Sequence, residues 1–151
     1  PTPGKDYTVL IDYSHTPDSL ENILRAVRGF CTGRIIAVFG CGGDRDPFKR
    51  PVMGKIAAEL SDLAIVTSDN PRTEDPYKIL RQILAGMQDT ETPYEVIESR
   101  ISAIGRAMEL AQKDDVIVLC GKGHETYQEI GHEKHHLDER EVVASYLEAN
   151  A

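Results

Sequence analysis

The feature that most constrains the fold of this chain is a series of short, almost wholly apolar runs separated by helical patterns. Four strong runs and a weaker fifth carry this signal: Tyr7–Ile11, Arg34–Phe39, Leu63–Thr67, Val116–Cys120 and the weaker Tyr94–Ile97. The four strong runs do not alternate between apolar and polar residues, as a half-exposed strand would. They are therefore typical of parallel strands that are covered on both faces.

Amphipathic helical patterns separate these runs. We expect the first helix to start at Pro17 and to end before Gly33, Pro51 to open the second, and the last to begin near Glu139. In each helix the apolar residues recur at spacings of three or four, which places them on one face. The predicted buried residues are, helix by helix, Leu20, Ile23, Leu24, Val27, Phe30 and Cys31; Val52, Met53, Ile56, Ala57 and Leu60; Ile79, Leu80, Ile83, Leu84 and Met87; Ile101, Ile104, Met108 and Ala111; and Val142, Val143, Tyr146 and Leu147.

This alternation of strands and helices predicts an α/β fold, a Rossmann-like, doubly wound and mostly parallel sheet with right-handed crossovers. Tyr127–Ile130 and His135–Leu137 flank Gly131 and predict a terminal hairpin, which would supply an antiparallel strand near the C-terminus. The length of 151 residues is typical of one domain, and no linker or repeat interrupts it. We therefore expect residues 1–151 to form a single domain.

Composition excludes several classes of partner and site. A formal net charge of −8 argues against nucleic acid, which needs a basic face, and no apolar run has the length of a membrane span. The three cysteines have no paired or metal-type spacing, which favours reduced thiols in the cytoplasm. The chain starts without Met and without a signal peptide, so we expect it to be a segment of a longer protein.

Four polar segments follow the four strong strands directly: Asp12–Thr16, Gly40–Arg50, Ser68–Asp75 and Gly121–Glu125. In an open α/β sheet, ligands bind beyond the carboxyl ends of the strands, where such loops converge. The sequence therefore predicts one binding site at this edge of the sheet, built from all four segments.

Each loop also has a less specific interpretation. The glycines of Gly40–Gly43 would let backbone N–H groups approach an anion and Arg45 would grip a carboxylate, or the segment is a solvated turn. It has neither a Walker ending nor a GxGxxG pattern. Asp69, Asn70 and Arg72, around a stiffening proline, suit a zwitterion, with Asp69 and the amide near its ammonium group and Arg72 on its carboxylate, but Asp-Asn-Pro is often only a turn.

The loop that contains Glu125 holds a carboxylate beside a lysine and a histidine, and so accepts a substrate amine or is simply a charged turn. His132, His135 and His136 lack the pattern of a tetrahedral metal site, so we expect no metal there. Cys41 and Cys120 lie at the ends of strands, near the predicted site, but neither has an activating partner. We therefore expect both thiols to be inert.

Taken together, four motifs closely resemble the C-terminal domain of the Mur ligases, and most specifically the members that add meso-diaminopimelate. The motifs are Asp12–Leu20 (DYSHTPDSL), Phe39–Asp46 (FGCGGDRD), Asp69–Arg72 (DNPR) and Gly121–Glu125 (GKGHE). The resemblance covers essentially the whole chain, with the motifs in order. It departs at Ser14, where the family usually has alanine, and this small change disturbs little.

The resemblance implies a three-domain enzyme of cytoplasmic peptidoglycan synthesis, of which this chain is the amino-acid-binding domain. The N-terminal domain would bind UDP-N-acetylmuramoyl-L-alanyl-D-glutamate. A central domain would supply most of the contacts to ATP and Mg²⁺ and would phosphorylate the substrate carboxylate. Diaminopimelate would then attack the acyl phosphate. By motif match, this domain would hold diaminopimelate through Arg45, Asp69, Asn70, Arg72, Gly121 and Glu125.

By the same match, Asp12 and His15 would approach ATP when the domains close. The P-loop and the carbamoylated lysine of the central domain have no counterpart here, so we expect no catalytic residue in this segment and no activity from it alone. Lysine-adding relatives carry a different residue at the position of Arg72, which favours diaminopimelate. A lysine-adding or cyanophycin-type ligase and a stand-alone binding module remain the alternatives.

Overall fold

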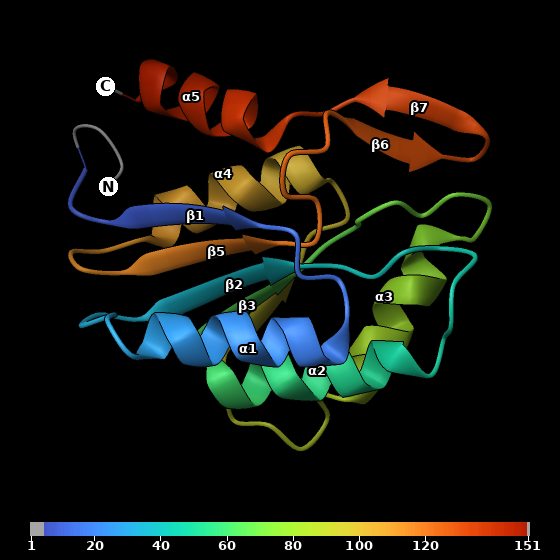
Figure 1. The fold of residues 1–151 in the computed structure, drawn as a ribbon, viewed down its shortest axis with the longest axis horizontal. Coiled ribbons are helices and arrows are strands. Elements are labelled where there is room, and N and C mark those ends of the chain that lie inside the picture. Colours follow the sequence, from blue (N-terminus) through green and yellow to red (C-terminus); the bar gives the residue numbers. More distant parts are fainter. Residues whose placement is uncertain (1–4, 151) are drawn as a thin grey trace.

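The computed structural model describes residues 5–150, and its centre is a five-stranded parallel sheet with helices on both faces (Figure 1). The strands lie in the order β1-β5-β2-β3-β4 and every pairing is parallel. Their bounds are β1 (Thr8–Asp12), β2 (Ile35–Phe39), β3 (Leu63–Val66), β4 (Tyr94–Val96) and β5 (Val116–Cys120). All five predicted strands and the α/β architecture are confirmed.

The helices divide between the two faces according to the direction in which the chain crosses the sheet. Helices α1 (Pro17–Arg28), α2 (Lys49–Leu60) and α3 (Pro76–Ala85) connect strands that advance from β1 towards β4, and they pack on one face (Figure 1). Helix α4 (Arg100–Leu110) returns the chain from β4 to β5 on the opposite face, where α5 (Glu139–Ala149) packs beside it. Crossovers of a single hand require this division.

Successive residues of each inner strand face opposite helical layers. In β2, Ile35, Ala37 and Phe39 pack with α1, α2 and α3, whereas Ile36 and Val38 pack with α4. Both sets are fully buried, which explains why the strands show no alternation of apolar and polar residues. Burying a side chain of this size stabilises the fold by about 1.5–3 kcal/mol, so this sandwiched sheet gives the site a rigid support.

The predicted C-terminal hairpin is present as β6 (Tyr127–Ile130) and β7 (Glu133–His136), joined through Gly131 at φ +63°. It forms its own two-stranded antiparallel sheet rather than extending the main one. The second strand starts at Glu133, two residues before the predicted start. One isolated parallel bridge, between Arg72 and Ile130, connects the hairpin to the loop after β3.

Three apolar residues that the helical pattern assigned to the core are exposed instead. Helix α1 ends at the cap residue Gly29, so Phe30 is not on its buried face and is 60% exposed. Val52 in α2 is 47% exposed and Ile101 in α4 is 54% exposed. Helix α2 also starts at Lys49, two residues before Pro51.

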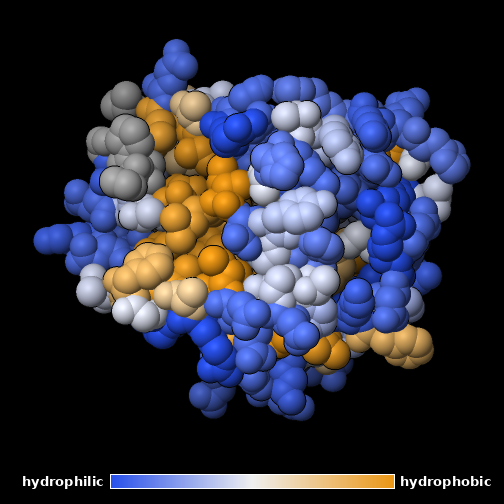
Figure 2. Space-filling view, viewed as in Figure 1, coloured by the Kyte–Doolittle hydropathy of each residue, from blue (hydrophilic) through white to orange (hydrophobic). Residues whose placement is uncertain are grey.

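The surface differs between the two ends of the strands. In Figure 2, which has the orientation of Figure 1, polar side chains cover most of the right-hand part, towards which β1, β2 and β5 point. Apolar side chains gather on the left, away from those loops. None of the helices described combines the length and the hydropathy needed to cross a bilayer.

Candidate functional site

The loops that follow β1, β2, β3 and β5 meet around a cavity of about 220 Å³. Among the residues predicted from the sequence, those that line it are His15, Arg45, Asp69, Asn70, Arg72, Gly121 and Glu125. Asp12 is outside this lining, and its Oδ2 accepts a hydrogen bond from the backbone N–H of Ser14 at 3.0 Å. The predicted convergence of the four loops is therefore confirmed.

The glycine-rich loop after β2 is packed tightly against the loop after β3. A Cβ on Gly43 would collide with the carbonyl of Pro71, and one on Gly40 would collide with the carbonyl of Thr67. The N–H of Gly43 donates to the carbonyl oxygen of Asn70 at 2.7 Å. The expectation that these glycines free backbone N–H groups for an anion is thus wrong for Gly43, whose N–H joins the two loops.

Arg72 is fixed by contacts on both sides. Its φ of +52° lies in the left-handed region, which costs a residue other than glycine about 1–3 kcal/mol unless its surroundings hold it there. Its Nε donates to Oε2 of Glu129 at 3.1 Å, and its Nη1 donates to the carbonyl of Gly43 at 3.0 Å. Its N–H donates to the carbonyl of Glu129 at 3.0 Å, so the guanidinium group is held at the cavity wall by the hairpin.

Asp69 presents a buried carboxylate to the same cavity. The residue is 7% exposed, and its buried Oδ1 has no hydrogen-bond partner among the residues the structure describes. Nζ of Lys122 is 3.7 Å from this oxygen. Gly121, at φ +119°, lies so near that a Cβ there would be 3.4 Å from Oδ2 of Asp69. A buried carboxylate oxygen in this condition is suited to receive a donor from a ligand.

Glu125 completes the anionic side of the cavity. Its Oε2 accepts a hydrogen bond from the hydroxyl of Tyr13 at 3.3 Å, and its Oε1 lies 3.4 Å from Nζ of Lys122. The negative charge of Glu125 raises the pKa of the exposed Tyr13 hydroxyl, with smaller contributions from burial and from the hydrogen bond. Tyr13 therefore stays protonated and acts here as a donor.

Three cations and three carboxylates thus line one cavity: Arg45, Lys49 and Arg72, with Asp46, Asp69 and Glu125. Arg45 lies on the exposed part of the loop after β2, where its Nη1 donates to the carbonyl of Asp44 at 3.0 Å. Arg72, Asp69 and Glu125 are more enclosed and are held by the contacts above. Paired cations and anions on one wall suit a small molecule that carries both charges.

Aromatic rings stand at the mouth of this cavity. The ring of Tyr13 meets that of His15 edge-on at 4.8 Å and stacks near that of His124 at 6.0 Å. The N–H of Gly43 is engaged by the carbonyl of Asn70 and that of Ser14 by the carboxylate of Asp12, so neither of these two N–H groups is free to bind a phosphate.

Two of the three histidines of the hairpin, His135 and His136, pair with glutamates. Nε2 of His136 lies 2.8 Å from Oε1 of Glu141, which raises the pKa of His136, and Nε2 of His135 lies 3.5 Å from Oε2 of Glu133. Over the described part of the chain, no group of three or more His, Cys, Asp or Glu side chains is arranged to hold a metal ion.

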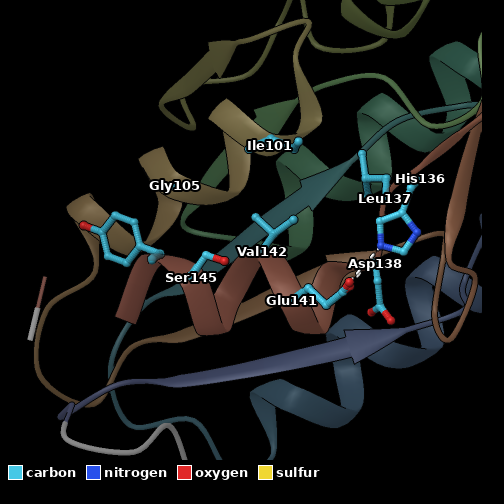
Figure 3. A pocket seen from close by; sticks show the side chains of 9 residues that line it. Ile101, Gly105, His136, Leu137, Asp138, Glu141, Val142 and Ser145 are labelled. Carbon is cyan, nitrogen blue, oxygen red and sulfur yellow. Dashed lines mark hydrogen bonds and ion pairs between the residues drawn. The ribbon is translucent and has the colours of Figure 1, made fainter. Parts of the chain in front are cut away.

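A second, larger cavity of about 390 Å³ lies elsewhere, between α4, α5 and the end of β7 (Figure 3). Ile101, Val142 and Tyr146 give it an apolar wall, and the contact between His136 and Glu141 lies at one end. It shares no residue with the cavity at the strand ends and has no paired arginines and carboxylates. The chemistry of the loops therefore belongs to the smaller cavity.

Comparison with known proteins identifies the family of this arrangement. Residues 2–123 match the family model described as Mur ligase, glutamate ligase domain. The chain belongs to the Mur ligase family. It is 63% identical over 145 residues to the UDP-N-acetylmuramoyl-L-alanyl-D-glutamate--2,6-diaminopimelate ligase of Trichormus variabilis, covering 96% of this chain and 29% of that protein. The ligase of the same name from Clostridium tetani is 55% identical over 142 residues, covering 94% of this chain and 29% of that protein.

A solved structure of a ligase of the same name superimposes with a TM-score of 0.93 at 40% identity. The match covers 97% of this chain and 30% of the solved chain. The Mur ligase chain described here therefore spans about 29–30% of the length of these relatives. The Rossmann-like fold predicted from its sequence is that of the solved ligase over the same region.

Several supports of this Mur ligase site have no signal in the sequence pattern. Arg50 is 1% exposed and bridges the loops, because its Nη2 donates to the carbonyl of Gly42 at 2.9 Å and to Glu74 at 2.7 Å. The side chain of Arg100 is fully buried. Its Nε lies 2.9 Å from Oε2 of Glu139, and its Nη2 donates to the carbonyl of Cys120 at 2.8 Å. These pairs fix the ends of the strands from which the site loops depart.

Two cysteines of the Mur ligase chain lie close to the site. Burial raises the pKa of the Cys41 thiol to about 12 and that of the Cys120 thiol to about 12. Both thiols are therefore protonated at neutral pH, and a protonated thiol is a poor nucleophile. This agrees with the expectation that both are inert.

Proposed function

We propose that this chain is the C-terminal, amino-acid-binding domain of a three-domain ligase that adds meso-diaminopimelate to UDP-N-acetylmuramoyl-L-alanyl-D-glutamate. The reaction would proceed in the cytoplasm through an acyl phosphate, with ATP and Mg²⁺ bound mainly by the central domain. The names of the relatives support this substrate pair, and the 63% identity to one of them supports its extension to this chain.

The observation that carries the proposal is the charge pattern of the cavity. Diaminopimelate has two carboxylates and two ammonium groups, whereas lysine has a single carboxylate. The cavity offers Arg45 and Arg72 to the carboxylates, and Asp69 and Glu125 to the ammonium groups. A site whose fixed cation is left unpaired by the wrong substrate discriminates strongly, by up to roughly 10⁴–10⁵.

In this proposal the residues of the chain bind and orient the amino acid and perform no covalent step. Arg72, held by the hairpin, would receive the carboxylate that distinguishes diaminopimelate from lysine. The unpartnered Oδ1 of Asp69 would accept from an ammonium group, and Asn70 and Gly121 would complete the wall. Holding the attacking amine in place beside the acyl group is worth up to roughly 7–11 kcal/mol.

Asp12 and His15 have a separate role in the proposal. His15 is exposed at the mouth of the cavity, and its Nδ1 lies 2.8 Å from the carbonyl of Tyr13. It would reach a nucleotide that another domain holds once the domains close. Asp12 would support that approach by fixing the turn through its hydrogen bond to Ser14.

The test is an amide-formation assay with the complete ligase, ATP, UDP-N-acetylmuramoyl-L-alanyl-D-glutamate and either meso-diaminopimelate or L-lysine. We expect product with diaminopimelate and little with lysine. Arg72→Ala should weaken use of diaminopimelate by roughly 30- to 4,000-fold, the loss expected when one partner of a buried charged contact is removed, while the KM for ATP stays within twofold. Arg25→Ala, on the exposed side of α1, is the matched control.

Two outcomes would count against the proposal. A kcat/KM for lysine that exceeds that for diaminopimelate in the unmodified enzyme would assign the site to a lysine-adding ligase. Diaminopimelate addition at full rate by the Arg72→Ala enzyme would remove the role given to Arg72.

A further inference from the structure

Lys122 is a wholly buried lysine, and within residues 5–150 the hydrogen-bond, ion-pair and ring partners of its ammonium group line the cavity or flank it. The residue is 0% exposed. Its Nζ lies 3.0 Å from Oδ1 of Asn70, 3.4 Å from Oε1 of Glu125 and 3.7 Å from Oδ1 of Asp69. The ring of Tyr127 lies 5.7 Å away. A buried ammonium group is stable only with such partners, and three of these four line the cavity.

The first consequence concerns the direction of the Asn70 amide. Its Oδ1 accepts from Nζ of Lys122 at 3.0 Å and from the backbone N–H of Glu129 at 2.9 Å. Neither group can accept a hydrogen bond, so the carbonyl end of the amide must face them. The NH₂ end of Asn70 is thereby left to donate towards the cavity, which suits a carboxylate of the ligand.

The second consequence concerns the two carboxylates. Asp69 and Glu125 would repel each other if they faced the cavity without a counter-charge between them. Lys122 lies within 4 Å of both and holds them together. With Lys122 present, the three side chains carry one net negative charge, which one ammonium group of a ligand neutralises.

Comparison with Arg100, another buried cation nearby, separates this role from ordinary support of the fold. Arg100, also fully buried, contacts Glu139 and the backbone carbonyls of Ser68 and Cys120. Neither Glu139 nor these carbonyls belongs to the residues that line the cavity. Arg100 therefore supports the strands, whereas the partners of Lys122 are side chains of the site.

We propose that Lys122 is a positioning residue for amino-acid selection, which sets the direction of the Asn70 amide and places the carboxylates of Asp69 and Glu125. This inference rests on the proposed function, since it assigns Lys122 to the same amino-acid site. Lys122 itself does not touch the reacting amine in this scheme.

The experiment compares Lys122→Met with Lys55→Met in the complete ligase. Lys55 is an exposed lysine of α2, 4.0 Å from Glu59, and it serves as the control. We expect Lys122→Met to raise the KM for diaminopimelate by roughly 10- to 150-fold, as for a lost hydrogen bond to a charged group, with the KM for ATP within twofold. An unchanged KM for diaminopimelate would overturn the proposal, and so would a KM for ATP that rises by the same factor as the KM for diaminopimelate.

A double-mutant cycle tests whether Lys122 acts through Asn70. If it does, Lys122→Met in an Asn70→Ala background should raise the KM for diaminopimelate by a smaller factor than in the unmodified enzyme. If the rise in KM for the double variant equals the product of the rises for the two single variants, Lys122 acts independently of Asn70, which would contradict the proposal.

A measurement on the unmodified enzyme covers the case in which Lys122→Met does not fold. The side-chain amide resonances of Asn70 should shift when diaminopimelate is added, whereas those of Asn22, exposed on α1, should not. An Asn70 amide that ignores saturating diaminopimelate would overturn the inference. An unmodified enzyme that neither binds nor adds diaminopimelate would instead refute the proposed function.

Discussion

Nε of Arg72 donates to Oε2 of Glu129 across 3.1 Å, so a residue of the hairpin fixes the guanidinium group that faces the cavity. We predict that Glu129→Gln raises the KM for diaminopimelate by roughly 2- to 13-fold, the range for one net hydrogen bond, because Arg72 then samples other orientations. Steady-state kinetics of the complete ligase measures this. Glu133→Gln, at an exposed position of the same hairpin, is the control and should leave the KM unchanged. Equal effects of both changes would contradict this reason.

The space around two glycines predicts opposite effects of their substitution on stability. A Cβ at Gly43 would collide with the carbonyl of Pro71, whereas a Cβ at Gly105 in α4 would lie in ordinary van der Waals contact, 3.8 Å from the ring of Tyr146. Gly43→Ala should lower the free energy of unfolding by about 1–3 kcal/mol through overpacking. Gly105→Ala should raise it by up to about 1 kcal/mol through helix propensity. Urea unfolding of both variants measures the difference, and stabilisation by Gly43→Ala would show that the loops are not packed as described.

The sheet and the place of the site could be predicted because both depend on local patterns. Uninterrupted apolar runs indicate strands covered on both faces, and the carboxyl ends of parallel strands share one edge. These two rules predict that the loops carrying Arg45, Arg72 and Glu125 meet, and all three residues line one cavity. The local patterns were also enough to find β4, although its exposed edge position makes its pattern weak.

The supports of the site could not be predicted, since they depend on contacts between distant residues. Arg100 and Glu139 are 39 positions apart, and each alone is typical of an exposed helix residue. Arg50 and Lys122 are buried for the same reason, because the carboxylates of Glu74 and Asp69, which lie in another loop, neutralise them. The prediction for Phe30 errs in the opposite direction, since its spacing predicts a buried residue and it is exposed. The apolar periodicity extends past Gly29, but the helix does not.

The Arg50–Glu74 pair predicts an acid-sensitive part of the stability. Hydrogen bonds from Arg50 lower the pKa of Glu74 from 4.5 to about 2. Because the pKa is lower in the folded state, the stabilisation is fully present above the unfolded value and is lost as pH falls towards 2. Glu74→Gln should therefore flatten the dependence of the unfolding free energy on pH between about 5 and 2. Chemical unfolding across this range measures the slope, and an unchanged slope would contradict the assignment. Glu59→Gln, on the exposed face of α2, is the control.

The fully buried pair of Arg100 and Glu139 predicts that one substitution harms more than two. Glu139→Gln leaves the guanidinium group of Arg100 without its counter-charge, and this should cost about 3–5 kcal/mol of the free energy of unfolding. The double variant Arg100→Met with Glu139→Leu removes both charges from a site with no exposure and should cost less than the single change, because no buried charge is left unpaired. Urea midpoints of the two variants decide between these values, with Glu141→Gln, at an exposed position of α5, as the control. A double variant less stable than Glu139→Gln would mean that the pair contributes more through its hydrogen bonds to Ser68 and Cys120 than its desolvation costs.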